Sequence, residues 1–100
     1  MKRCLIVDDS KVIRMVARKI IQEFGLDTEE AAGGYDALES CEKSMPDAIL
    51  LDWKMPGMNG IDFIKAVRGK SGGDEPVIIF CTTEEAVSYT HLTLPTIYSV

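Results

Sequence analysis

Three short, unbroken runs of apolar residues constrain the fold of this chain more than any other feature. They occupy residues 4–7, 48–51 and 77–81 and are rich in β-branched side chains. Runs of this length without polar alternation are typical of strands buried on both faces, as in a parallel sheet. A more polar stretch at 26–32 fits an edge strand of the same sheet.

Helical periodicity fills the segments between these runs. Apolar side chains recur at helical spacing from Val12 to Phe24, and similar patterns cover 35–43 and 60–68. Because strands alternate with helices, right-handed crossovers are expected, which gives an α/β fold with a doubly wound parallel sheet. Ligands of such sheets bind at the carboxyl ends of the central strands.

Charge and hydropathy narrow the class of protein. The net charge of −5 argues against a surface that binds a nucleic-acid backbone. No apolar run approaches the ~20 residues of a membrane-spanning helix, and the N-terminus does not resemble a signal peptide. We therefore expect a cytoplasmic protein that binds neither nucleic acid nor membrane directly.

Acidic residues follow two of the predicted strands. Asp8 and Asp9 come directly after the first apolar run, and Asp52 comes directly after the run at 48–51. Because the carboxyl ends of parallel strands share one edge of the sheet, the three carboxylates are expected to converge. Such a cluster is repulsive without a cation, and its oxygen ligands suit Mg²⁺. A carboxylate beside Mg²⁺ can also be the nucleophile toward a phosphoryl group.

Taken singly, these residues also have purely structural interpretations. Asp8 and Asp9 would stabilise the N-terminus of the following helix, and Asp52 would open a turn. Thr82, after the run at 77–81, would be a strand residue or a helix cap. The joint placement of the acids favours a phosphoryl site, in which the Thr82 hydroxyl could hydrogen-bond a phosphoryl oxygen on Asp52.

Three segments in order resemble the receiver domain of two-component response regulators, the CheY-like flavodoxin-like fold. They are LIVDDS at 5–10, DWKMPGMNG at 52–60 and PVIIFCTT at 76–83. The resemblance implies that Asp52 accepts a phosphoryl group from the phosphohistidine of a histidine kinase or phosphotransfer protein, after which the domain switches conformation. It implies a signalling protein, of the kind found in chemotaxis, rather than an enzyme.

The same resemblance implies roles for the residues around Asp52. Asp9 would ligate Mg²⁺ directly and Asp8 mostly through water, and the backbone carbonyl of Lys54 would be a further ligand. Thr82 would be the switch hydroxyl, with the neighbouring Thr83 as the second candidate.

Composition changes abruptly after residue 85. Every charged residue lies within 1–85, whereas 86–100 holds the only histidine and two of the three tyrosines. Residues 87–100 resemble the translation of an adapter used for sequencing libraries, which is not part of a fold. We therefore expect a partial, C-terminally truncated receiver domain at 1–86 and a non-native tail at 87–100.

This division implies that the last helix, strand and helix of a receiver are missing. The run at 77–81 would then be an unpaired apolar edge, and part of the first helix would be uncovered. We therefore expect low stability for the chain.

Two other functions stay open on the sequence alone. A Mg²⁺-dependent phosphatase or phosphotransferase also passes through an aspartyl phosphate, but such enzymes typically carry a second acid two positions after the nucleophile, where this chain has Lys54. The chain could also be an inert gene fragment, since the Lys-Pro pair that ends a receiver's last strand is missing.

Overall fold

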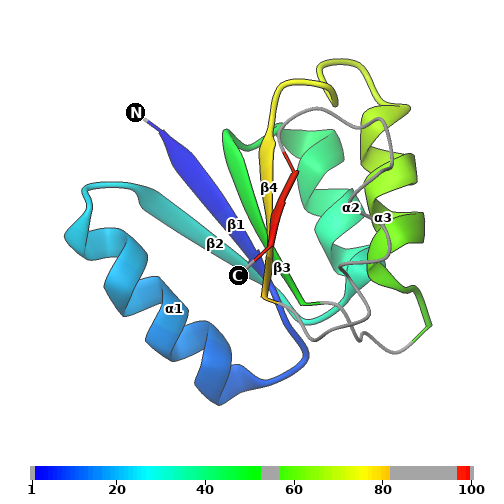
Figure 1. Cartoon of the computed structure of the whole chain (residues 1–100). Coiled ribbons are helices and arrows are strands. Elements are labelled where there is room, and N and C mark those ends of the chain that lie inside the picture. Colours follow the sequence, from blue (N-terminus) through cyan, green and yellow to red (C-terminus); the bar gives the residue numbers. More distant parts are fainter. Residues whose placement is uncertain (1, 53–56, 82–96, 100) are drawn as a thin grey trace.

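The computed structural model describes residues 2–52, 57–81 and 97–99, which form a sheet with helices on both faces (Figure 1). In chain order the elements are β1 (Arg3–Val7), α1 (Lys11–Glu23), β2 (Asp27–Ala31), α2 (Gly34–Lys43), β3 (Ala48–Asp52), α3 (Gly60–Arg68), β4 (Val77–Cys81) and β5 (Ile97–Ser99). The strands lie in the order β2-β1-β3-β4-β5, and all neighbours are parallel. The predicted doubly wound parallel sheet is confirmed.

The two faces of the sheet carry different layers. Helices α2 and α3 pack on one face, and α1 lies on the other (Figure 1). The core fills the space between the sheet and the α2–α3 layer, and its strand members are Leu5, Val7, Ala31, Ile49, Leu51 and Ile78. The helices contribute Ala37, Cys41, Ile61, Phe63, Ile64 and Val67. A close-packed layer of this kind holds β1 and β3 in a rigid register.

Side-chain caps stabilise the N-termini of α1 and α3. The Ser10 hydroxyl accepts a hydrogen bond from the Ile13 N–H at 3.3 Å, which satisfies a donor in the first turn of α1. Asn59 caps α3 in the same way, through the Asp62 N–H at 2.9 Å.

Among the described residues, no helix has the length and apolar content that a membrane crossing requires.

A fifth strand corrects one expectation. β5 pairs with β4, with Ile78 aligned to Ile97 and Phe80 to Ser99. The expectation that β4 is an unpaired edge is therefore wrong. Strand pairing uses backbone N–H and C=O groups, which a segment supplies whatever its origin. For that reason the pairing does not test the assignment of 87–100 to a non-native tail, which stays a prediction.

The apolar face of α1 is largely exposed, as expected for the first helix. Val12, Ile13, Val16 and Ile20 are each more than half exposed, and Phe24 at the C-cap is 77% exposed. With side chains from β1, β3 and β4, this face lines an apolar groove of about 630 Å³. An amphipathic helix normally buries such a stripe, so α1 contributes less apolar burial than α2 and α3 do.

We expect this groove to bind the dye 1-anilinonaphthalene-8-sulfonate and to raise its fluorescence. Replacing Val16 and Ile20 together with glutamine should lower that fluorescence several-fold. The free energy of unfolding should change by less than about 1 kcal/mol, because both side chains already lie half in water and glutamine is the better helix former. Dye titration and urea unfolding provide the two measurements. If the wild-type chain does not raise the fluorescence of the dye, the conclusion that the apolar face of α1 is exposed would be contradicted.

Candidate functional site

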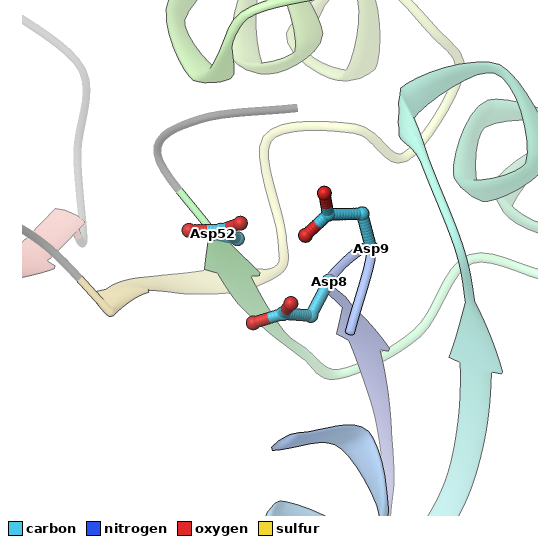
Figure 2. Close-up of side chains that lie close together, drawn as sticks. All are labelled: Asp8, Asp9 and Asp52. Carbon is cyan, nitrogen blue, oxygen red and sulfur yellow. The ribbon is translucent and has the colours of Figure 1, made fainter. Parts of the chain in front are cut away.

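The carboxyl ends of β1 and β3 bring three aspartates together. Asp8 and Asp9 directly follow β1, and Asp52 is the last residue of β3 (Figure 2). One carboxylate oxygen from each lies within 4.8 Å of the other two. The register explains this proximity: Val7 is aligned with Leu51, so Asp8 and Asp52 emerge at the same level. The predicted convergence of the three carboxylates is confirmed.

Asp8 is the most constrained member of the cluster. It is buried, and its N–H donates to the Ala31 carbonyl of β2 at 3.1 Å. Its Oδ1 accepts a hydrogen bond from the Ser10 N–H at 2.8 Å. Its own carbonyl accepts one from Nη1 of Arg14 at 2.5 Å. A buried carboxylate is tolerated only with such partners, so neighbouring elements fix both the backbone and the side chain of Asp8.

Exposure differs among the three acids. Asp8 is buried, Asp52 is half-buried and Asp9 is exposed. Solvent therefore reaches the cluster at Asp9, whereas Asp8 is shielded from solvent. A group that reacts with a partner protein must be reachable, and Asp52 combines partial exposure with a rigid position at the end of a central strand.

The residues present fit a hard divalent cation. Among the residues that the structure describes, the cluster offers carboxylate oxygens and no nitrogen or sulfur ligand. Oxygen is the donor type that Mg²⁺ prefers. Like charges this close repel one another, and a cation among them removes the repulsion. The donor set is thus consistent with the predicted cofactor.

Three predicted site residues lie outside the described residues: Lys54, Thr82 and Thr83. The structure describes the strand that leads to the two threonines. Asp52 is aligned with Cys81, the last residue of β4, and Thr82 is the next residue in the chain. The roles of Lys54, Thr82 and Thr83 stay predictions.

Two residues next to the cluster, Arg14 and Glu30, were not predicted from the sequence. Arg14 bonds the Asp8 carbonyl, and its Nε lies 3.2 Å from Oε1 of Glu30. The sequence feature that could have indicated Arg14 is its spacing of four residues from Arg18, which puts both guanidinium groups on one face of a helix. Their common partner, Glu30, lies on another element, so its position could be known only from the fold.

Comparison with known proteins identifies the family. The model of the response regulator receiver domain family matches residues 4–95. The chain therefore belongs to the response regulator receiver domain family, and the predicted resemblance is confirmed.

Individual relatives agree with this assignment. Sporulation initiation phosphotransferase F of Bacillus subtilis is 40% identical over 67 residues, which cover 67% of this chain and 54% of that protein. Chemotaxis protein CheY1 of Helicobacter pylori is 38% identical, covering 82% of this chain and 68% of that protein. The chain thus matches 54% of the length of the first relative and 68% of the length of the second.

A solved structure shares the fold. The response regulator TrrA from Thermotoga maritima, in complex with Mg²⁺-BeF, superimposes with a TM-score of 0.87 at 32% identity. The match covers 100% of this chain and 86% of that one.

Proposed function

We propose that this chain is a phosphoacceptor of a two-component signalling system, with Asp52 as the residue that is phosphorylated. The observation that carries the proposal is the convergence of Asp8, Asp9 and Asp52 within 4.8 Å at the carboxyl edge of the sheet. The family assignment and the phosphotransferase and chemotaxis proteins among its relatives support the same function.

In the proposed reaction, a carboxylate oxygen of Asp52 attacks the phosphorus of a phosphohistidine on a histidine kinase or phosphotransfer protein. A bond from that oxygen to phosphorus forms, the phosphorus–nitrogen bond breaks, and the imidazole nitrogen leaves with the electron pair. The product is an acyl phosphate on Asp52. The rigid end of β3 contributes by holding the nucleophile in one orientation.

Asp9 and Asp52 would hold Mg²⁺ directly, Asp8 mostly through water, and the Lys54 carbonyl would be a further ligand. When bound, the cation would neutralise the carboxylates and the phosphoryl oxygens. The TrrA complex with Mg²⁺-BeF supports this cofactor. In this proposal Thr82, or less favourably Thr83, then hydrogen-bonds a phosphoryl oxygen and biases a two-state switch that a partner reads.

Incubation of the chain with acetyl phosphate and Mg²⁺ tests the function. We expect slow labelling that saturates at one phosphoryl group per chain, measured by intact-protein mass spectrometry, and no labelling when EDTA removes the cation. Release of many equivalents of phosphate per chain would instead indicate a phosphatase or phosphotransferase. A folded chain that acquires no label would show that it is inert and would refute the proposal.

A further inference from the structure

Arg14 of α1 connects the acidic cluster to the edge strand β2. Its Nη1 donates to the Asp8 carbonyl at 2.5 Å, and its Nε lies 3.2 Å from Oε1 of Glu30. The Arg14 side chain is only 14% exposed. The second carboxylate oxygen of Glu30 pairs with Nη1 of Arg18 at 2.9 Å. Glu30 therefore holds two guanidinium groups, of which Arg14 is the one that bonds Asp8.

The peptide that joins Asp8 to Asp9 is fixed by this contact. The Asp8 carbonyl is part of that planar peptide unit, so a hydrogen bond to the carbonyl sets the rotation of the plane. The orientation of the plane determines how the Asp8 and Asp9 side chains are directed relative to each other. On the other side of Asp8, its N–H is held by the Ala31 carbonyl, one residue after Glu30. Residues 30 and 31 of β2 thus hold both ends of the Asp8 backbone, Glu30 doing so through Arg14.

We propose that Arg14, oriented by Glu30, is a positioning residue that directs Asp8 and Asp9 toward Asp52 for cation binding. This inference rests on the proposed function, because it takes the cluster to be a Mg²⁺ site. Arg14 acts through the backbone of Asp8 and does not itself touch the cation or the phosphoryl group.

Electrostatics alone makes the opposite prediction for the loss of Arg14. The Arg14 guanidinium, which bonds the Asp8 carbonyl, places a positive charge beside the acidic cluster. On electrostatic grounds its removal should therefore tighten Mg²⁺ binding. If Arg14 positions the ligands, its removal should weaken Mg²⁺ binding, because the Asp8–Asp9 peptide can then rotate. The sign of the change therefore separates the two roles.

The experiment measures Mg²⁺ affinity by isothermal titration calorimetry for the wild type and a set of variants. Arg14→Ala should bind Mg²⁺ about 10-fold more weakly, as is typical when a group that orients a metal ligand is removed. Arg14→Lys should recover part of this loss, since lysine keeps the positive charge but lacks the planar fork whose separate N–H groups bond the carbonyl and Glu30. Glu30→Gln should weaken binding by a smaller factor.

Two control variants remove arginines that do not contact Asp8. Arg18→Ala removes the other partner of Glu30 and should change the affinity by less than about 2-fold. Arg3→Ala breaks the 3.0 Å pair with Glu29 at the opposite end of β1. It should lower the melting temperature without changing the Mg²⁺ affinity.

A spectroscopic readout adds an independent test. In ¹⁵N–¹H spectra recorded without Mg²⁺, the Asp9 amide should shift more in Arg14→Ala than in Arg18→Ala, because this amide belongs to the peptide that Arg14 holds. If Arg14→Ala does not fold, Arg14→Lys and Glu30→Gln provide the measurement.

The outcomes separate the inference from the proposed function. Unchanged or tighter Mg²⁺ binding in the folded Arg14 variants would overturn the positioning role while leaving the function intact. Equal losses in Arg14→Ala and Arg3→Ala would also overturn it, as a general effect of stability. A wild-type chain that binds no Mg²⁺ would overturn both.

Discussion

Replacing Asp52 with asparagine is expected to abolish labelling by acetyl phosphate, with the signal falling to background. The amide keeps the shape of the side chain but is not a nucleophile toward phosphorus, so no acyl phosphate can form. Asp8 should not take over the reaction, because it is buried with its oxygen hydrogen-bonded to the Ser10 N–H. Mass spectrometry after incubation with Mg²⁺ and acetyl phosphate measures the effect.

Asp36→Asn is the matched control for this substitution. Asp36 is an exposed acid in the first turn of α2, and its replacement should leave labelling at the wild-type level. Circular dichroism should show that both variants remain folded. Persistent labelling of Asp52→Asn at the wild-type rate would place the phosphoacceptor elsewhere and would remove the basis of the proposed mechanism.

Replacing Phe63 with alanine is expected to destabilise the chain by about 3–5 kcal/mol, which is the range for deleting a buried phenylalanine ring. Phe63 lies on α3 and is fully buried in the core between the sheet and the α2–α3 layer. Small domains have only about 5–15 kcal/mol of stability in total. We therefore expect the variant to lose a large share of its stability, seen as a lower midpoint of urea unfolding followed by circular dichroism.

Phe24→Ala is the control that separates burial from residue type. Phe24 is 77% exposed at the end of α1, so its replacement should cost less than about 1 kcal/mol. Equal losses of stability at the two positions would mean that the α1 face carries as much of the core as the α2–α3 layer. That result would contradict the unequal covering of the sheet.

Much of the fold was predictable because buried strands and amphipathic helices leave strong local patterns. The apolar runs at 48–51 and 77–81 correspond to β3 and β4, and the periodic segment at 60–68 is α3. The more polar stretch at 26–32 contains the edge strand β2. In each case the local order of apolar and polar side chains indicates how the element is buried: on both faces, on one face or at an edge of the sheet.

The acidic cluster was also predictable, for a topological reason. Once β1 and β3 are read as parallel strands, Asp8 and Asp52 must lie at the same edge of the sheet, because parallel strands end together. The preference for Mg²⁺ followed from the oxygen ligands, and the Thr82 hydroxyl from its place after a predicted strand. The assignment of Asp52 as the phosphoacceptor and the roles of Lys54 and Thr83 came from the family resemblance. Of these, the structure describes the position of Asp52 alone.

Other features depend on contacts between segments that are distant in the chain. The pairing of β5 with β4 uses backbone groups that every non-proline residue has, so no side-chain pattern could signal it.

Whether residues 87–100 belong to the native protein is a question about the origin of the segment. An independent clone of the gene, sequenced beyond the codon for Glu85, would decide that prediction.

The sequence by itself determined the α/β class, the parallel sheet and the meeting of three carboxylates, because each follows from local patterns and from strand direction. Only the tertiary structure decided how the cluster is held. The contact between Arg14 and the Asp8 carbonyl, with Glu30 behind it, joins α1, the end of β1 and β2. Each of these residues alone resembles an ordinary surface charge, and their common role arises from distances that only the folded chain creates.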